Sequence, residues 1–364
     1  MFVALRDLRF AKGRFALMGS VIVLITLLVG LLSGLTAGLA RENVSAVTGL
    51  PVDHLAFAAP PSGRAVSFTN SVVGEGAWRT WAGQPGVRAA EPVGIRTLDA
   101  TSDDRTAAVS AFGVEPHGMI APGRLAPGRA VLSARAAADL GVVVGDAVRL
   151  GPRTVIVADV SGDASYSHTP VVWTSLEDWQ ALGRGGGTDG GTVPAGQATV
   201  VALRTDGSAD LGAADRAAGT RTLALDEALT AIGSYQAENG SLQLMRGFLF
   251  AISALVIGAF FTVWTIQRSA DVAVLKALGA PTPYLLRDAL GQAAVMLGAG
   301  TLTGTALALG AGALVGGGDV PFVQETSTVL LPALVMIVLG MLGAALSVRR
   351  ITAVDPLTAL GSAR

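Results

Sequence analysis

The chain has 364 residues, of which 51% are hydrophobic and only 15% are charged, against about 25% charged residues in an ordinary soluble domain. This composition excludes a disordered chain and argues against a purely soluble one. The formal net charge of −1 provides no global basic surface for nucleic acid, and the absence of cysteine excludes disulfides, thiolate catalysis, iron–sulfur clusters and cysteine zinc sites. The histidines, His54, His117 and His168, are too few and too scattered for a metal centre built from histidine.

Four stretches without Asp, Glu, Lys or Arg are long enough to cross a bilayer, which takes roughly 20 apolar residues. We expect transmembrane helices at residues 15–40, 247–267, 289–318 and 326–348. The glycine-rich stretches could instead be buried helices of a large soluble core, but charge-free runs of this length are rare in soluble folds. The first stretch is much longer than the apolar region of a signal peptide, although the small residues before Arg41 imitate a cleavage site. We therefore expect an uncleaved helix there.

The orientation in the membrane follows from the positions of Arg and Lys near the helix ends. Basic residues precede the first span, separate the second from the third and follow the fourth, and none lies between the third and fourth. We therefore predict a cytoplasmic amphipathic segment at 1–14, a cytoplasmic loop at 268–288 and a cytoplasmic tail at 349–364. The short loop at 319–325 and the long segment at 41–246 are then outside, and both termini are inside the cell.

The segment 41–246 mixes strand and helix signals, which is typical of an α+β domain. Short runs that are mostly rich in β-branched residues are bounded there by Gly, Asp or Pro. These runs predict strands at 130–132, 147–150, 154–160, 170–173 and 199–203.

Helix signals occur in the same segment. Residues 133–140 and 175–182 predict short helices, each with a serine as N-cap residue, and Gly141 stands just past the end of the first. Residues 183–196 are rich in glycine and predict a mobile loop. Apolar residues at helical spacing over 225–232 predict part of a stalk helix that leads into the second span.

No catalytic constellation is present in the sequence. It contains no G-x-S-x-G, no H-E-x-x-H and no pair of carboxylates framed by aromatic residues. The pair Asp103 and Asp104 is more typical of a solvated turn than of an acid–base pair. Because the chain also lacks a G-x-x-x-x-G-K-[ST] loop, any ATP-driven work requires a partner, and we expect the chain not to be an enzyme.

The cytoplasmic loop at 268–288 contains the pattern of a short amphipathic helix. Ser269 can cap its first turn, and Asp271 suits the positive end of the helix dipole. Gly279 and Pro281 end it. The apolar face carries Val272, Val274, Leu275 and Leu278. By periodicity alone, this helix either lies on lipid head groups or docks as a lever into a partner protein.

The order of one span, a large outer domain and three further spans resembles the FtsX/MacB-type permeases of ABC transporters. The sequence VAVLKALGA at 272–280 resembles the apolar loop helix of that family, and a second helix at 284–292 would then enter the third span. Residues 130–150 are similar to the core of the family's extracytoplasmic domain. Residues 351–360 resemble its closing element.

The resemblance implies a membrane α-helical fold with four transmembrane helices and an α+β, MacB-like extracytoplasmic domain in the bacterial cell (plasma) membrane. It implies a homodimer of this chain on two copies of a cytoplasmic ABC ATPase subunit, which binds ATP and magnesium. The chain itself would carry no intrinsic cofactor. Movement of the outer domains by the ATPase would be a form of mechanotransmission. The implied ATPase-coupling helix comprises Ser269, Asp271, Val272, Leu275, Lys276, Leu278 and Gly279.

A narrower resemblance lies at the N-terminal end. Residues 1–14 are similar to the amphipathic start of Hrt-type haem-efflux permeases, and GLTAGLAREN at 34–43 resembles the end of their first span. This resemblance implies export of haem from the membrane. Two other functions of the wider family stay open, namely an FtsX-like mechanotransmission regulator of cell-wall hydrolases and a permease that extrudes lipoproteins or peptides.

A haem site needs an axial ligand, cations for the propionates and an apolar slot. The candidates beside the predicted outer ends of the first two spans are Arg41, Glu42, Tyr235, Glu238 and Arg246. If the second segment is helical, Tyr235, Glu238 and Leu242 share a face, and Arg246 lies near it. In a dimer, two copies of Glu238 could approach one iron from both sides.

Each candidate also has a structural interpretation. Glu238 could be a solvated or salt-bridged position at the membrane rim, Arg41 and Arg246 could anchor the helices by snorkelling, and Tyr235 could belong to the interfacial aromatic belt. Histidines such as His168 are more typical of surface or hydrogen-bonded polar positions than of haem ligands.

Three glycines, Gly30, Gly34 and Gly38, repeat every four residues along the first predicted span. Such a repeat lets helices approach closely, which predicts that this face forms the dimer interface. A bulky replacement such as Gly34→Leu would then impair dimerisation. The alternative is that the glycines reflect a glycine-rich coding bias.

Overall fold

The computed structural model of the chain describes residues 12–103, 105–123, 125–183, 196–267, 274–276, 278–315 and 320–352. The chain divides into two compact units. The helical unit comprises Met1–Gly38 and Ser241–Arg364, and the α/β unit comprises Leu39–Gly240.

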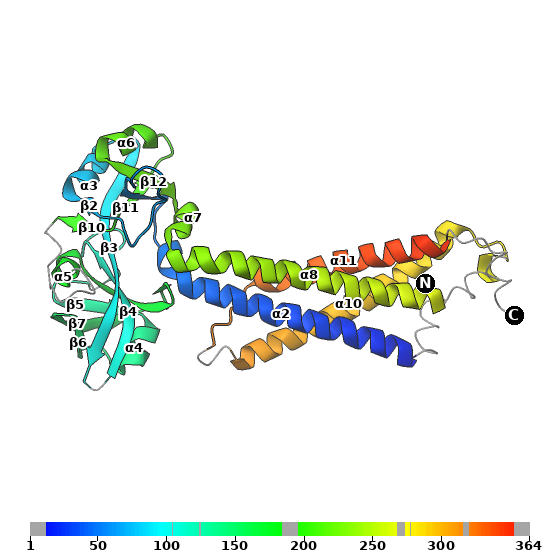
Figure 1. Ribbon diagram of the computed structural model, residues 1–364. Helices are drawn as coiled ribbons and strands as arrows, with labels where there is room; N and C mark the ends of the chain where they lie inside the picture. Colours follow the sequence, from blue (N-terminus) through cyan, green and yellow to red (C-terminus); the bar gives the residue numbers. More distant parts are fainter. Residues whose placement is uncertain are drawn as a thin grey trace. The chain divides into compact units, whose positions relative to one another are not determined.

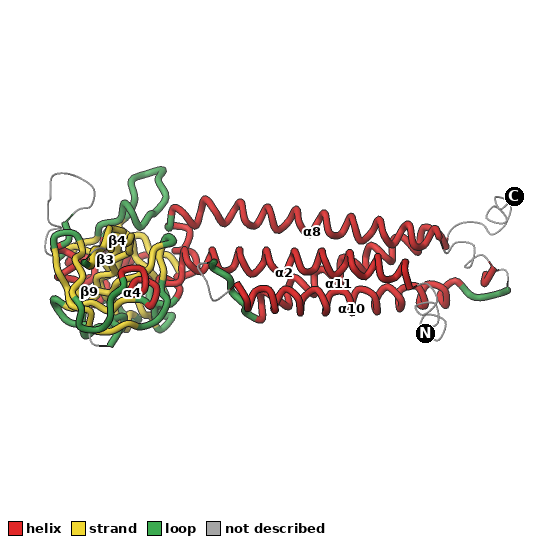
Figure 2. The backbone as a smooth tube through the Cα atoms, turned by 90° about the horizontal axis from the view of Figure 1, so that it is seen from below, coloured by secondary structure: helices red, strands yellow, loops and turns green. Residues whose placement is uncertain are grey.

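Four long helices dominate the helical unit: α2 (Lys12–Thr48), α8 (Gly233–Gln267), α10 (Thr282–Val315) and α11 (Thr326–Thr352). Each contains a stretch that is long and apolar enough to cross a membrane. They run side by side in both views (Figures 1 and 2). The predicted fold class, four membrane helices with a mixed α and β domain, is therefore confirmed. The helix predicted over 284–292 is continuous with the third span in α10.

The helices of the bundle approach closely at small residues. The buried side chains of Ile22, Phe261, Leu297 and Met336 form its core. A Cβ atom added to Gly300 would lie 2.6 Å from Ile22, so the backbone of α10 rests almost directly on α2. Lipid provides no hydrophobic drive for the association of membrane helices, so van der Waals packing of this kind is a main source of their stability.

The α/β unit is built on a ten-stranded mixed sheet with a separate two-stranded sheet, β10–β2. The main path runs β12-β1-β11-β3-β4-β9-β5-β7-β6, with β8 paired to β9. The strands are β1 (His54–Ala58), β2 (Val73–Gly74), β3 (Val87–Ser102), β4 (Arg105–Val114), β5 (Arg129–Leu132), β6 (Ala147–Leu150), β7 (Arg153–Val160), β8 (Ser165–Tyr166), β9 (Thr169–Ser175), β10 (Gln197–Ala198), β11 (Val200–Thr205) and β12 (Thr220–Ala224). Each of the five predicted strands lies within or overlaps one of these.

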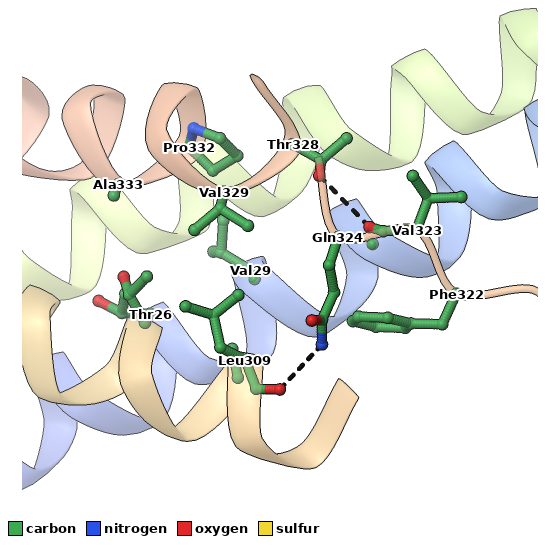
Figure 3. A pocket seen from close by; sticks show the side chains of 14 residues that line it. Thr26, Val29, Leu309, Phe322, Val323, Gln324, Thr328, Val329, Pro332 and Ala333 are labelled. Atoms are coloured by element: carbon green, nitrogen blue, oxygen red, sulfur yellow. Dashed lines mark hydrogen bonds between the residues drawn. The ribbon is translucent and has the colours of Figure 1, made fainter. Parts of the chain in front are cut away.

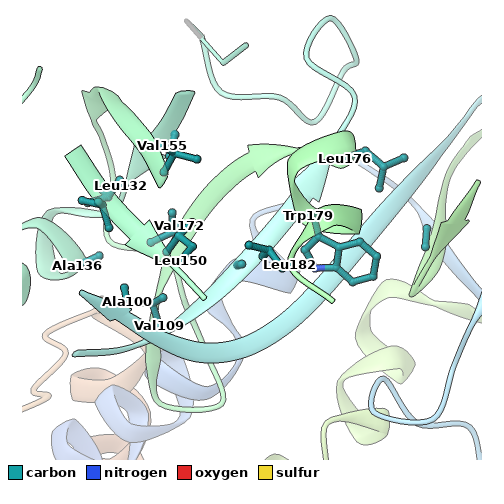
Figure 4. Close-up of a cluster of buried hydrophobic side chains, with 14 of the residues drawn as sticks. Ala100, Val109, Leu132, Ala136, Leu150, Val155, Val172, Leu176, Trp179 and Leu182 are labelled. Carbon is teal, nitrogen blue, oxygen red and sulfur yellow. The ribbon is translucent and has the colours of Figure 1, made fainter. Parts of the chain in front are cut away.

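Both faces of the sheet are covered, which explains the apolar strand sequences. Along β11, Val200 and Ala202 belong to one buried cluster, whereas Val201 and Leu203 belong to another. Successive side chains of a strand point to opposite faces, so the two clusters lie on opposite faces of the sheet. Figure 4 shows part of the cluster to which Val201 and Leu203 belong, with Trp179 against the long strand β3.

The predicted helix caps are confirmed. In α4 (Ala134–Leu140) the Ser133 hydroxyl accepts the Ala136 N–H at 3.3 Å, and Gly141 ends the helix at φ 66°. In α5 (Leu176–Ala181) the Ser175 hydroxyl accepts the Asp178 N–H at 3.0 Å. Two further helices, α3 (Glu75–Ala82) and α6 (Leu211–Ala218), were not predicted.

The predicted stalk helix over 225–232 is wrong in its connection to the second span. The segment forms α7 (Leu225–Ala228) and a 3₁₀ turn (Leu229–Ala231), and Ile232 is extended at φ −82° and ψ 111°. The chain therefore breaks before α8 begins at Gly233. In the predicted mobile loop, residues 184–195 lie outside the described part of the chain.

Candidate functional site

The predicted substrate residues lie on two helices. Arg41 and Glu42 are near the C-terminal end of α2, and Tyr235 and Glu238 are near the start of α8. These four belong to the α/β unit, whereas Arg246 belongs to the helical unit. The segment from Tyr235 onward is helical, which is the condition on which the predicted shared face depended.

The hairpin of β8 and β9 turns through two strained residues. The pair Tyr166 and Thr169 closes it, and between them Ser167 and His168 have φ values of 50° and 65°. Turns of this kind usually carry Asn or Gly, which tolerate positive φ. The Ser167 N–H donates to the Asn43 carbonyl at 2.9 Å, and the His168 N–H donates to the neighbouring carbonyl of α2 at 3.2 Å. Helix α2 thus holds the strained turn in place.

This turn places the imidazole of His168 against the carboxylate of Glu238. The His168 Nε2 atom lies 2.9 Å from Oε2 and 3.1 Å from Oε1 of Glu238. The Asn43 side-chain amide donates to Glu238 Oε2 at 3.3 Å. Because Asn43 is only 1% exposed, its amide is fixed by the packing around it and orients the carboxylate.

A second carboxylate lies on the other side of the imidazole. Glu42 Oε2 is 4.0 Å from His168 Nδ1, and the same side chain forms an ion pair with Arg135 of α4. The side chains of Glu42, His168 and Glu238 are 21, 28 and 39% exposed. The imidazole therefore stands between two carboxylates that a ligand can reach from solvent.

Ser234 connects these groups into one network. Its hydroxyl donates to Asn43 Oδ1 at 2.8 Å and lies 2.9 Å from the hydroxyl of Ser167. We use the name Glu238 cluster for Glu42, Asn43, Ser167, His168, Ser234 and Glu238. Three segments that are distant in the sequence thus meet within the α/β unit.

The Glu238 cluster offers a ligand carboxylate oxygens and an imidazole. Among the residues that the structure describes, no group of three or more His, Cys, Asp or Glu is placed to hold a metal ion. A metal that already carries most of its ligands, as in a porphyrin, needs only one or two from the protein.

The two tyrosines near the Glu238 cluster, Tyr235 and Tyr166, pack in the core of the α/β unit. Tyr235 packs against the buried apolar cluster that includes Ile232 and Tyr166. Burial raises the pKa of the Tyr166 phenol, so this group stays neutral beside the strained turn. Tyr235 thus contributes to the core of the α/β unit, a role that neither the haem-site prediction nor the aromatic-belt interpretation described.

Arg246 is held inside the helical unit. Its guanidinium donates to the Thr36 hydroxyl of α2 at 2.7 Å, and Thr36 is buried. Its Nε atom is buried and has no hydrogen-bond partner among the described residues. A buried donor without an acceptor is costly, so an anionic group at this position would be stabilised.

The glycine stripe of α2 contacts other parts of the same chain, whereas its predicted role as a dimer interface stays a prediction. A Cβ atom on Gly30 would lie 2.8 Å from Ala308 of α10, one on Gly34 would overlap the ring of Phe322, and one on Gly38 would overlap the main chain of Pro321. Figure 3 shows Phe322 beside the apolar pocket that Val29, Leu309 and Val329 help to line. The close approach that the repeat predicts is real, but its partners are α10 and the loop before α11.

Hydrogen bonds fasten this loop to the bundle. The Val323 N–H donates to the Gly34 carbonyl at 3.2 Å, and the Gln324 amide donates to the Leu309 carbonyl at 2.8 Å. The face of α2 that carries Gly34 is therefore packed against the loop before α11 of the same chain.

The predicted coupling helix is described only in its second half. Ser269, Asp271 and Val272 lie outside the described residues, whereas Leu275 and Lys276 are helical. Gly279 ends the turn at φ 90°, as predicted. The side chains of Val274, Leu275 and Leu278 are 53, 37 and 80% exposed, so the apolar face is uncovered in this chain.

Sequence reasoning missed the partners of Glu238. Asn43 was part of a motif without a role, and His168 was assigned to a polar position at the surface. The hydrogen bonds of His168 agree with a polar position, and they also place this residue at the predicted haem site beside Glu238. No local sequence signal marks this turn, because neither Ser167 nor His168 favours the positive φ that it requires.

Comparison with known proteins finds a family model that matches part of the chain and relatives that align with nearly all of it. Residues 244–356 match the family model described as FtsX-like permease C-terminal. A Staphylococcus haemolyticus protein named as the HrtB permease of a hemin transport system is 26% identical over 367 residues, covering 99% of each chain. An uncharacterised ABC transporter permease of Mycobacterium tuberculosis is 28% identical over 380 residues, again covering 99% of each chain.

Two solved structures resemble the chain in part. The periplasmic region of MacB from Actinobacillus actinomycetemcomitans covers 52% of this chain and 97% of its own at 12% identity, with a TM-score of 0.36. The extracellular domain of the ABC-type transporter YknZ from Gram-positive bacteria covers 48% and 98% at 14% identity, with a TM-score of 0.35.

Proposed function

We propose that this ABC transporter permease, whose residues 244–356 form an FtsX-like permease domain, exports haem from the membrane with ATP hydrolysis supplied by a separate subunit. The similarity to the hemin transport permease supports this proposal because it covers 99% of each chain and so includes the α/β unit as well as the helices. The family accounts for the ATPase partner, since permease and nucleotide-binding subunits of ABC transporters work together.

The Glu238 cluster is the observation that carries the haem proposal. A haem iron already has four porphyrin nitrogens and takes one or two axial ligands from the protein. Glu238 supplies such a ligand, while His168 and Asn43 orient its carboxylate by hydrogen bonds of 2.9 and 3.3 Å. Arg41 and Arg246 are the candidate partners of the propionates.

The cytoplasmic loop supports the coupling to an ATPase. Leu278 is 80% exposed and lies just before the glycine that ends its helical turn. An exposed apolar turn of this kind docks readily into a groove of a partner protein. In this proposal the loop and both termini are cytoplasmic, the α/β unit is outside, and two copies of the chain sit on two ATPase subunits.

The test of this function is haem-stimulated ATP hydrolysis. The permease and its ATPase would be reconstituted in lipid nanodiscs, and phosphate release would be measured with increasing haem. We expect saturable stimulation of several-fold, and none with protoporphyrin lacking iron, because the proposed ligand binds the metal. Equal rates with and without haem would contradict the proposal, and stimulation by a lipoprotein or peptide alone would favour the extrusion alternative.

Replacing Arg246 by alanine is expected to weaken haem binding several-fold, because the variant loses a half-buried cation that suits a propionate. The matched control is Thr36→Val, which removes the hydrogen bond between Thr36 and Arg246 but keeps the charge. Haem titration followed by absorbance compares the two purified variants. Equal weakening in both would assign Arg246 to helix packing and would remove it from the haem site.

A further inference from the structure

Strand β3 changes partners along its length and leaves part of one edge open. Its first half pairs with β11 as far as Val93, its second half pairs with β4 from Gly94 to Ser102, and β6 pairs with it again at Ala100 and Thr101. Between Val93 and Ala100, no strand among the residues that the structure describes pairs with the edge opposite β4, although the short strand β10 lies near β3.

The register of the hairpin decides which main-chain groups face this open edge. The pair Ser102 and Arg105 closes the hairpin around a two-residue turn, so the even-numbered residues of β3 exchange hydrogen bonds with β4. The odd-numbered residues then point their N–H and C=O groups away from β4. In agreement, the Ile95 N–H donates to the Thr199 hydroxyl at 2.8 Å on that side.

Thr97 and Asp99 are the residues left over by this alternation. Both are exposed, and neither main-chain group of either residue has a hydrogen bond to another described residue on that edge. Each therefore offers one donor and one acceptor in the spacing that an antiparallel strand requires. Unpaired edges of this kind bind extended chains, and natural proteins usually protect them.

The open edge lies in a groove of the α/β unit. The groove has a volume of about 850 Å³, which lies within the roughly 300–1,000 Å³ of ligand pockets in proteins. One wall is aromatic, with Phe68 and Tyr166 in an edge-to-face pair at 5.7 Å. The other wall carries Trp179, with the Arg96 guanidinium 4.9 Å from its ring (Trp179 is labelled in Figure 4).

We propose that the edge of β3 at Thr97 and Asp99 binds an extended segment of a partner polypeptide, which joins the sheet as an added antiparallel strand. The sheet of a second copy of this chain does not fit against the open edge, because β11 and β6 pair with β3 on either side of it. A single strand of about five residues spans the gap at roughly 3.3 Å per residue. Its alternate side chains face the two walls, so apolar residues at every second position suit the aromatic wall. This binding is independent of the haem proposal.

The first test measures amide hydrogen exchange in the full chain in detergent. We expect the amides of Thr97 and Asp99 to exchange at least about tenfold faster than those of Arg96 and Leu98, because only the even-numbered amides donate to β4. Slow exchange at Thr97 and Asp99 would show that the edge is already covered, and the proposal would be abandoned.

The second test tethers a strand at the groove, which the absence of cysteine in the chain makes site-specific. A Thr69→Cys variant places one thiol at the mouth of the groove, since Thr69 is exposed and lines it. A peptide of alternating Val and Thr with a terminal Cys would be attached by a disulfide, giving a high local concentration. We expect exchange at Thr97 and Asp99 to slow about tenfold, and no change with the same peptide methylated on alternate main-chain nitrogens. If both peptides slow the exchange equally, or if neither slows it, strand addition is contradicted.

A variant of the edge itself provides the control. Thr97→Pro removes the N–H that faces the groove without removing a bond to β4, and proline is tolerated on such edges. It should abolish the protection of Asp99 by the tethered peptide, whereas Thr97→Val, which keeps the N–H, should not. If the proline variant does not fold, Val72→Trp, which fills the groove from an exposed position, provides the same comparison. Full protection in a folded blocking variant would refute the proposal.

Discussion

Replacing Glu238 by alanine is expected to weaken haem binding by roughly 10- to 100-fold, the effect of losing one charged ligand of about 1.5–3 kcal/mol. The carboxylate is held by His168 and Asn43 at 2.9 and 3.3 Å, so it is oriented before any ligand arrives. Such preorganisation lowers the cost of binding. The measurement is a haem titration of the purified chain in detergent, followed by its absorbance spectrum.

The spectrum separates ligation from packing. Glu238→Gln keeps the size of the side chain and a carbonyl acceptor for its neighbours, but it removes the charge that binds iron. We expect a shifted or absent haem band in this variant while the thermal unfolding temperature changes little. Glu227→Ala, which alters an exposed glutamate of α7, is the matched control and should bind haem normally. Normal haem spectra in both Glu238 variants would remove the Glu238 cluster from the proposed function.

Most of the helical unit could be predicted from the sequence because a bilayer imposes a simple rule. A helix that crosses lipid needs a long run without charge, and such runs mark α2, α8, α10 and α11. The caps of α4 and α5 were also predictable, since Ser133 and Ser175 act on backbone groups within three residues. Local chemistry is visible in a sequence when both partners are local.

The sheet was only partly predictable for the opposite reason. Strand β3 contains Pro92 and Gly94, and its burial does not alternate regularly because its neighbours change from β11 to β4. Its first half is therefore defined by a strand more than 100 residues later in the chain. Periodicity reports the environment of a strand only where that environment is constant along its length.

The candidate site shows the same limit. The face that Glu238 shares with Tyr235 followed from spacing once the segment was assumed to be helical. Its partner His168, however, is 70 residues away in a turn whose φ values no propensity would assign to Ser and His. Likewise, the spacing of Gly30, Gly34 and Gly38 indicated a close contact without naming what makes it. A sequence pattern can thus indicate that a residue makes a close contact without indicating which residue it contacts.

Replacing Gly34 by leucine is expected to destabilise the helical unit by about 3 kcal/mol, the upper range for overpacking of a filled site. Even a Cβ atom at this position would overlap the ring of Phe322, which also rests against Gly312. The helix or the loop must therefore move, and the hydrogen bond from the Val323 N–H to the Gly34 carbonyl would be strained with it. Thermal unfolding in detergent measures the loss.

A double-mutant cycle decides between this intramolecular contact and a dimer contact. Phe322→Ala alone should also destabilise the chain, by about 3 kcal/mol, because it leaves a cavity. In the double variant the space left by the ring accepts the leucine, so we expect the combined loss to be smaller than the sum by about 1–3 kcal/mol. Gly310→Leu, at a glycine with open space around it, is the control and should change little. If the losses in the cycle are additive and Gly34→Leu alone dissociates a dimer, the glycine stripe forms an interface between copies of the chain. In that case the leucine displaces a residue of a partner chain and not Phe322.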